Sequence, residues 1–413
     1  MSATLGLFEG FGIELEYMIV DGAQLDVLPV TDQVLMSVAG DFVNETAQGR
    51  LAWSNELVLH VIELKTNGPA ASLDGLADAF QADLRRIDEL LQALNGRLMP
   101  TAMHPWMNPL RETRLWPHQH NLIYESYDRI FGCQGHGWSN LQSMHINLPF
   151  DGDEEFSRLH TAIRTLLPLM PALAASSPIV DGRLSGALDS RLEAYRVNAA
   201  RIPSITGAVV PESVSSRAEY EARILDPMYR DIAPHDSGGI LQQEWLNSRG
   251  AIARFDRNAI EIRVLDIQEC PHADLAVAAT IVRVLQALVE ERWSAQPVQQ
   301  ALPLADLAEL LVQVSRHGGE AVVRDRRYLE ALGAPMEASL SAADLWRHVL
   351  ESTPPWKGAD AAAWHDALRV IVDEGCLARR IVRAVGADPG RDRLRSVYRE
   401  LCDCLLAGCQ FRA

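Results

Sequence analysis

Four stretches of the chain carry the apolar and polar pattern of β-strands. Alternation is clearest in GIELEYMIV, QSMHINLP and NAIEIRVLD. Side chains two residues apart share one face of a strand, so each of these stretches has one apolar and one polar face. Asp21-Gly22 closes the first stretch, and Asn67-Gly68-Pro69 closes another β-branched run. We expect strands over 12–20, 57–64, 140–149 and 254–265.

Helical periodicity dominates the remainder of the chain, including almost all of the last third. A long amphipathic helix is predicted from Ser72 to the Asn95-Gly96 turn. A second covers 156–175 and is disturbed by Pro168 and Pro171. Further helices are predicted at 271–292, 304–317, 341–350, 361–385 and 391–406. This order of elements predicts an α+β protein, in which an antiparallel, helix-covered sheet precedes a helical C-terminal portion that packs on it.

The polar faces of three predicted strands carry an unusual set of side chains. The paired positions are Glu14 and Glu16, His145 and Asn147, and Glu261 and Arg263. One such strand alone is typical of a solvated sheet surface. Three strands together favour the wall of a barrel or curved sheet whose concave side is polar and whose convex side lies under helices.

Carboxylates crowded on one concave wall repel one another unless cations lie between them. Glutamates with a histidine and no cysteine form an oxygen-rich ligand set suited to Mg²⁺ or Mn²⁺. An arginine beside such a set is typical of a phosphate bound through bridging divalent ions. The residues therefore indicate a metal–nucleotide site.

The segment WSNELVLHVIELK adds two candidate ligands, Glu56 and Glu63. Their odd separation puts them on opposite faces of a straight strand. Both can face one site only if Glu56 lies in the turn before the strand or the strand bulges. A solvent-facing place at the strand ends is the alternative for Glu56 and Lys65.

Composition narrows the class of protein. The 413 residues are 48% hydrophobic and 23% charged, which excludes disordered and fibrous classes. Lys and Arg number 38 against 55 Asp and Glu, and the net charge of −17 argues against nucleic acid as a partner. No apolar run reaches about 18 residues and no basic segment opens the chain, so we expect neither a membrane span nor a signal peptide. Six cysteines without a CxxC pair are typical of reduced thiols in a cytoplasmic protein, with a zinc site at 402–409 as the alternative.

Together, these segments resemble the glutamate–cysteine ligase family, especially its bacterial carboxylate–amine ligase branch. GIELEYMIVD is similar to the family's G-[IL]-E-x-E strand, and ELVLHVIELKTN to its acidic-x₆-E-[LF]-x-T segment. QSMHINLP resembles its x-H-x-N strand and AIEIRVLDIQECP its I-E-x-R-x-x-D strand. LPLMPALAASSPIVDGRLSGALDSRLEAYR resembles its S-x-S-P turn and R-x-x-x-Y segment. The resemblance covers about residues 8–290, in the family order.

The resemblance implies a glutamine-synthetase-like fold, in which a curved antiparallel sheet forms a funnel with ATP at one end. It also implies that ATP and Mg²⁺ drive amide formation between the γ-carboxylate of glutamate and an amine, cysteine or another, through an acyl phosphate. Arg263 and Asn147 fall at nucleotide-binding positions. Arg263 and Arg191 are the catalytic candidates, Arg191 as a clamp for a carboxylate or phosphate. The implied metal ligands are Glu14, Glu16, Glu56, Glu63, His145 and Glu261.

We expect residues 1–290 to form the catalytic core and 291–413 a helical portion integrated with it. Glutamate and an amine are the expected partners, and the resemblance favours a homodimer. Two other classes stay open: a guanidine or amine phosphokinase, and a non-catalytic nucleotide-binding regulatory protein. The loops at 104–120 and 235–240 are candidates for closing over the site, and the histidines of 104–138 for recognising the amine.

Overall fold

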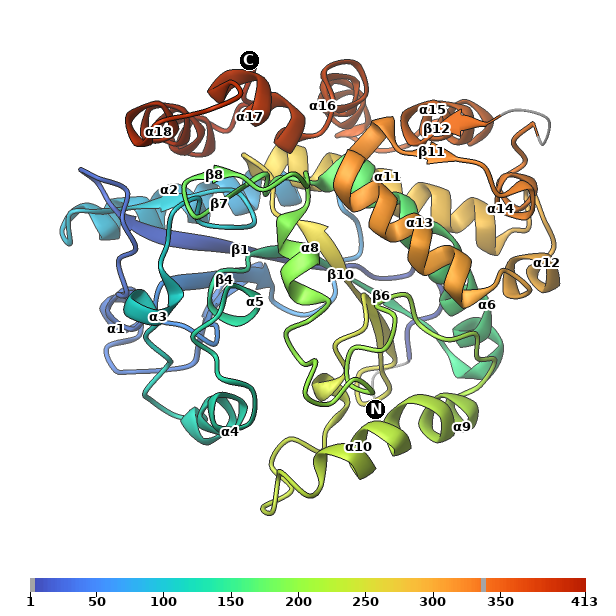
Figure 1. Ribbon diagram of the computed structural model, residues 1–413, viewed down its shortest axis with the longest axis horizontal. Helices are drawn as coiled ribbons and strands as arrows, with labels where there is room; N and C mark the ends of the chain where they lie inside the picture. Colours follow the sequence, from blue (N-terminus) through green and yellow to red (C-terminus); the bar gives the residue numbers. More distant parts are fainter. Residues whose placement is uncertain (1–3, 336–338) are drawn as a thin grey trace.

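The computed structural model describes residues 4–335 and 339–413, and its centre is one antiparallel sheet. Strand direction turns from β1 and β4 to β9 and β10, so the sheet is curved (Figure 1). Its order is β2-β3-β4-β1-β6-β10-β9, with β5 paired to the second half of β1. The strands are β1 (Gly12–Asp21), β2 (Glu45–Gln48), β3 (Leu51–Asn55), β4 (Val61–Thr66), β5 (Gly96–Met99), β6 (Ser143–Pro149), β9 (Ala251–Arg254) and β10 (Ala259–Asp266).

The predicted strands at 12–20 and 140–149 correspond to β1 and β6. The prediction of one strand over 57–64 is wrong in part, because residues 56–60 form the connection between β3 and β4. The predicted strand over 254–265 divides into the end of β9 and β10, because residues 255–258 make a hairpin turn with Asn258 at a φ of 49°.

The sheet buries one face under two long helices. Ile13, Leu15 and Ile146 on this face are fully buried, and they belong to the same apolar core as Phe80 and Ile281 of the covering helices. Figure 1 shows both helices on one side of the sheet, with the C-terminal helices forming a further layer outside them. The covering helices are α2 (Leu76–Gln92) and α11 (Pro271–Val289).

The C-terminal third is helical, as predicted. The helix predicted over 361–385 divides at Gly375, whose φ of 87° cannot continue a right-handed helix. The main apolar core runs from Ile13 to Leu405, so it includes residues on both sides of position 290, while the domain boundary itself stays a prediction. The helices are α12 (Gln296–Gln300), α13 (Leu304–His317), η4 (Gly318–Glu320), α14 (Arg326–Ala331), α15 (Ala342–Ser352), α16 (Ala361–Glu374), α17 (Leu377–Val385) and α18 (Arg391–Ala407).

The other face of the sheet is more open, with short helices and loops around its rim (Figure 1). The helix predicted over 156–175 is interrupted near Pro168 and Pro171, as expected, and forms α6, η1 and α7. The remaining helices are α1 (Thr31–Ala39), α3 (Pro109–Glu112), α4 (Asn121–Phe131), α5 (His136–Ser139), α6 (Gly152–Leu166), η1 (Leu167–Leu169), α7 (Pro171–Ala174), α8 (Ser190–Tyr195), α9 (Arg217–Tyr220), η2 (Glu221–Leu225), α10 (Asp226–Ile232) and η3 (Glu244–Leu246). Two small sheets pair β7 (Ile179–Val180) with β8 (Arg183–Leu184) and β11 (Val322–Val323) with β12 (Leu340–Ser341).

One helix in the described part of the chain, α11, is long and apolar enough to cross a membrane by length and composition. Within its most apolar window, 83% of the residues are buried inside the protein. It packs against α2, α6 and α16, so its apolar character is explained by its place in the core.

A fully buried ion pair ties the C-terminal helices to the sheet. Arg380 of α17 lies 2.5 Å from Glu269, which is in the loop between β10 and α11, and both side chains have no exposed surface. The same guanidinium donates to the carbonyl of Phe411 at 2.5 Å. The last residues of the chain therefore help to satisfy a buried charge near the end of a central strand.

Replacing Arg380 with Met should destabilise the fold by about 3–5 kcal/mol, because it leaves the Glu269 charge buried and unpaired. Urea unfolding measures the change. Arg412→Ala is the control, since Arg412 pairs with Glu374 at the surface and should cost less than about 1 kcal/mol. Equal effects of the two variants would contradict the assignment.

Candidate functional site

The carboxylates named from the sequence lie on the sheet face opposite α2 and α11. Strand pairing brings them together, because Glu16 of β1 is paired with Glu63 of β4. Glu14 of β1 is paired with His145 of β6. In the next pair, Glu261 of β10 lies across from Asn147 of β6. The polar faces predicted for three separate strands therefore form one continuous surface.

Glu14 is held by the neighbouring strand. Its carboxylate lies 2.8 Å from Nδ1 of His145 and accepts a hydrogen bond from the Asn147 amide at 3.0 Å. Burial raises the pKa of Glu14, but the hydrogen bond and charge of His145 and the charge of Lys65 outweigh it and lower the pKa to about 2. Gly12 leaves room for Asn147, because a Cβ at this position would lie 2.9 Å from the Asn147 Cβ.

Glu16 and His145 share Ser143, which the sequence reasoning missed. The Ser143 backbone N–H and hydroxyl donate to Glu16 at 2.7 and 3.0 Å, and Nε2 of His145 lies 2.9 Å from the same hydroxyl. Burial lowers the pKa of His145. The hydrogen bond to Glu14 and the charges of Glu14, Glu16 and Glu261 raise it by a larger amount, so the net shift is upward. Ser143 begins a strand whose alternation already singled out His145, so the same pattern could have found it.

Glu56 and Glu63 face the same site, because Glu56 lies in the connection between β3 and β4. Burial and the charge of Glu14 raise the pKa of Glu63 to about 7, against the opposing effects of Lys65 and of Ser54, whose hydroxyl donates at 2.6 Å. Burial and the charges of Glu63 and Glu16 raise the pKa of Glu56 well above its usual value. Without a cation, Glu56 therefore holds a proton at neutral pH and Glu63 is partly protonated there.

Two overlapping sets of side chains are close enough to hold metal ions. Within each set, one ligand atom per residue lies within 4.8 Å of the others, and Glu63 belongs to both sets. Carboxylates, alone or with one imidazole, suit Mg²⁺ or Mn²⁺. Burial and the neighbouring glutamates raise the pKa values of Glu56 and Glu63, and a bound cation would oppose both effects. The residues therefore fit a divalent cation. The two sets are Glu14, Glu63 and His145, and Glu16, Glu56 and Glu63.

Glu261, the remaining predicted ligand, has different neighbours. Its carboxylate lies 3.0 Å from Nε of Arg263, 3.5 Å from Arg254 and 3.8 Å from Nδ1 of His145. Among the described residues it belongs to neither metal set. Its role as a metal ligand stays a prediction. For Glu261 to bind a metal ion, Arg254 and Arg263 would have to turn toward another anion.

Arg263 and Arg191 meet at a β-bulge that the sequence pattern did not show. The pairing of β10 with β6 shifts between Ile262 and Leu265, so an extra residue is inserted beside Arg263. Arg191 donates to the Arg263 carbonyl at 2.7 Å and lies 3.4 Å from Asp266. Only 2% of Arg191 is exposed, so its guanidinium supports the bulge, and its predicted clamp role stays a prediction.

Asp266 pairs with the Arg191 guanidinium that supports the bulge. The sequence pattern did not identify it as a functional residue. Its carboxylate accepts from the Ser176 N–H and the Ser177 hydroxyl, both at 2.8 Å. Burial and the nearby charge of Asp266 raise the pKa of Asp189 well above its usual value. Burial raises the pKa of Asp266 as well, but Arg191, Ser176 and Ser177 oppose that rise, so Asp189 holds a proton more strongly than Asp266 does.

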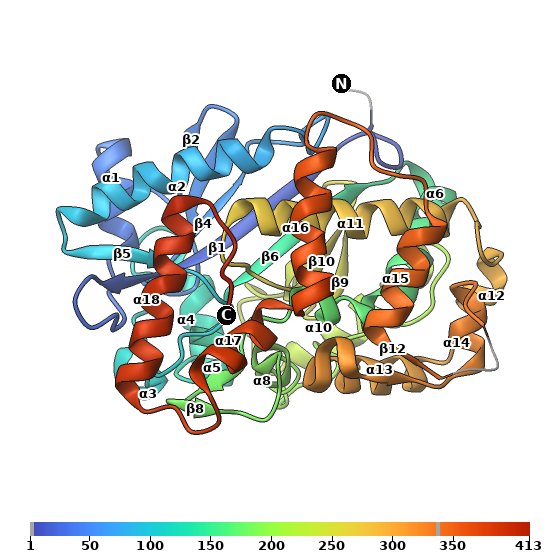
Figure 2. The ribbon, with the colours of Figure 1, turned by 90° about the horizontal axis from the view of Figure 1, so that it is seen from above.

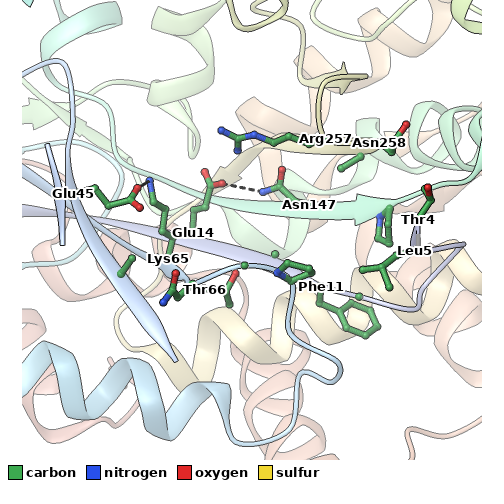
Figure 3. A pocket seen from close by; sticks show the side chains of 18 residues that line it. Thr4, Leu5, Phe11, Glu14, Glu45, Lys65, Thr66, Asn147, Arg257 and Asn258 are labelled. Carbon is green, nitrogen blue, oxygen red and sulfur yellow. Dashed lines mark hydrogen bonds and ion pairs between the residues drawn. The ribbon is translucent and has the colours of Figure 1, made fainter. Parts of the chain in front are cut away.

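A pocket of about 540 Å³ opens beside Glu14 and Asn147 (Figure 3). Lys65 lines it from β4, where its ammonium lies 3.0 Å from Glu63 and 2.8 Å from Glu45. Arg257, from the β9–β10 turn, lies across the pocket. Its volume suits a small-molecule substrate, with Lys65 and Arg257 at its wall and Glu14, a member of one metal set, in its lining.

The histidines of 104–138 mostly make structural hydrogen bonds. His104 is fully buried, lies 2.8 Å from the Leu25 carbonyl and has its pKa lowered to about 3, with burial as the largest cause. His118 lies 3.0 Å from Asp32, and His120 lies 2.9 Å from the Asn44 amide. The 104–120 segment mixes buried and exposed residues, and its closing over the site stays a prediction. Recognition of an amine by these histidines stays a prediction.

A helix-covered, curved antiparallel sheet with carboxylates on its open face is the glutamine-synthetase-like fold class. The structure is similar to the glutamate–cysteine ligase of Francisella tularensis solved in complex with AMP, with a TM-score of 0.58, 13% identity and coverage of 97% of this chain and 90% of that one. It is also similar to a bifunctional glutathione synthetase from Pasteurella multocida, with a TM-score of 0.59, 16% identity and 97% of this chain covered, which corresponds to 53% of the longer chain. At these identities the likeness is one of fold.

Sequence similarity identifies the family. The model of glutamate–cysteine ligase family 2 (GCS2) matches residues 10–400. A protein of unassigned function from Archaeoglobus fulgidus is 34% identical over 395 residues, covering 95% of this chain and 98% of that one. A protein of Rubrobacter xylanophilus that carries the provisional name glutamate–cysteine ligase 2-3 is 26% identical over 384 residues, covering 88% and 94%. The chain belongs to glutamate–cysteine ligase family 2.

Divalent cations should stabilise the protein more at about pH 8 than at about pH 6, because they replace protons on Glu56 and Glu63. The folded pKa of Glu63, about 7, exceeds its ordinary 4.5, so the stability of the metal-free fold falls as pH rises through this range. Thermal unfolding with and without Mn²⁺ measures both effects. Glu63→Gln should remove much of the metal-free pH dependence, and an equal metal effect at both pH values would contradict the prediction.

Proposed function

We propose that this protein is an ATP- and Mg²⁺-dependent carboxylate–amine ligase. It joins the γ-carboxylate of glutamate to an amine through an acyl phosphate. The observation that carries the proposal is the pair of carboxylate sets sharing Glu63, beside a pocket lined by Lys65 and Arg257. Family membership supports the ligase class, and the AMP bound to the Francisella tularensis enzyme supports an adenine nucleotide.

The electrostatics of the site explain why a cation is needed. Both substrates are anionic, and the sheet face presents further carboxylates to them. Held by Glu14, Glu16, Glu56, Glu63 and His145, Mg²⁺ would offset this repulsion and polarise the transferred phosphoryl group.

The chain's own residues bind and orient the reactants. Lys65 and Arg257 line the pocket and attract phosphates, and Arg263, once released from Glu261, would stabilise negative charge on the phosphoryl group. A γ-carboxylate oxygen of glutamate attacks the terminal phosphorus of ATP, and ADP leaves. The amine nitrogen then attacks the acyl carbon, phosphate leaves, and the nitrogen loses a proton as the amide forms.

The first test measures ADP release from ATP and Mg²⁺ with glutamate held constant and a panel of amines varied, cysteine included. We expect release that depends on glutamate and one amine, with the amide identified by mass. A phosphorylated amine formed without glutamate would favour a phosphokinase. Bound nucleotide with no turnover for any pair would favour a regulatory protein.

Glu63→Gln should lower kcat/KM for ADP release by about 100-fold or more, because both metal sets lose a shared carboxylate. Glu45→Gln is the matched control, since Glu45 pairs with the same lysine but belongs to neither set. Comparable losses in both variants would show that Lys65 pairing, and not metal binding, explains the effect.

Asp266→Asn should lower kcat about 10- to 100-fold by releasing Arg191 from the Arg263 carbonyl, and it should also destabilise the fold by about 3–5 kcal/mol, because the Arg191 charge is left buried and unpaired. Asp189→Asn is the control, because this carboxyl is already protonated and an amide replaces it closely. A kcat loss in Asp189→Asn as large as in Asp266→Asn would contradict the assigned charge states.

A further inference from the structure

A second pocket lies on the other side of the sheet from the carboxylate sets. It has a volume of about 400 Å³ and is lined by the second half of α11, residues 71–73 ahead of α2, and residues 354–357. Figure 2 shows the chain between α15 and α16 running beside α11. Its size suits a small molecule, and it shares no residue with the metal sets.

The pocket contains two cations without acidic partners. Arg283 donates to the carbonyls of Leu350 and Thr353 at 2.8 Å, and burial lowers its pKa. In the described part of the chain, neither Arg283 nor Lys357 forms an ion pair. The acidic residue of the lining, Glu290, lies 3.8 Å from Arg292 instead. Lys357 is exposed, but Arg283 is half-buried, and a half-buried cation without an acidic partner favours an anionic ligand.

Aromatic rings form the wall beside these cations. The Arg283 guanidinium lies 4.7 Å from the centre of the Trp356 ring, and Trp364 meets Trp356 edge to face at 6.5 Å. Trp364 is 6% exposed, and its indole N–H has no acceptor among residues 4–335 and 339–413. The wall therefore offers flat apolar surface and a spare donor next to positive charge.

We propose that this pocket binds a small organic carboxylate with a flat aromatic body. The carboxylate pairs with Arg283 and Lys357. The aromatic body lies against Trp356 and Trp364. The proposal depends only on this juxtaposition of cations and rings, and not on the ligase function proposed above.

The charges in the lining favour a carboxylate over a phosphate. One nitrogen of Arg283 donates to two backbone carbonyls, so its other nitrogens are available to a ligand. Glu290 adds a negative charge to the same lining. Arg283, Lys357 and Glu290 together leave about one net positive charge in the lining, which matches a monoanion better than a phosphate dianion. Phe11 lines this pocket and the pocket beside Glu14, so an occupant contacts a side chain common to both.

Calorimetric titration of the full chain with phenylacetate tests the proposal. We expect saturable binding with a Kd at or below about 1 mM. Acetate lacks the ring and phenethylamine reverses the charge, so each should bind at least about tenfold more weakly. No saturation by about 10 mM phenylacetate, or equal binding of phenethylamine, would overturn the proposal.

Variants locate the binding site. Lys357→Gln should weaken phenylacetate about threefold and Arg283→Gln about tenfold or more. Arg283 also donates to carbonyls at the end of α15, so Arg283→Gln could fold poorly. Lys357 is exposed, and Lys357→Gln therefore tests the site without disturbing the fold. Arg369→Gln removes a charge from α16 outside the pocket and should leave the affinity unchanged. Unchanged affinity in Lys357→Gln, or an equal loss in Arg369→Gln, would place the ligand elsewhere.

Discussion

Five glutamates and a histidine share the open face of one sheet, and the repulsion between their charges constrains the rest of the site. At separations near 4 Å, like charges in a partly buried setting repel by about 4 kcal/mol. In the metal-free protein, the carboxyls therefore differ in protonation state. At neutral pH Glu14 is ionised beside His145, whereas Glu56 retains its proton and Glu63 is partly protonated. A site arranged in this way is ready to exchange protons for divalent cations.

The apolar side of the sheet makes this crowding tolerable. Every site-bearing strand places fully buried side chains such as Leu15 and Ile146 behind its polar face, where α2 and α11 cover them. Backbone hydrogen bonds then hold β1, β4 and β6 in register, so the carboxylates cannot move apart. Burial on one face thus offsets the electrostatic cost on the other.

The arginines Arg191 and Arg263 belong to a second arrangement, which begins at Asp266, the last residue of β10. Asp266 holds Arg191, Arg191 holds the Arg263 carbonyl, and the bulge turns Arg263 toward Glu261. A few residues further, Glu269 anchors Arg380 and the end of the chain. One loop between β10 and α11 therefore connects the site to the C-terminal helices, which explains why those helices pack as part of one core.

Alternation along single strands was enough to predict which side chains share a face, because the side-chain period of two is a local property. It identified Glu14, Glu16, His145 and Glu261, and the family resemblance added the fold. Contacts between distant segments decided the rest. Glu56 faces the site only because β3 ends early, Arg191 is buried by its partners, and Glu261 lies among arginines. A strand end, a bulge and an ion pair depend on residues far apart in the chain, so only the tertiary structure could determine them.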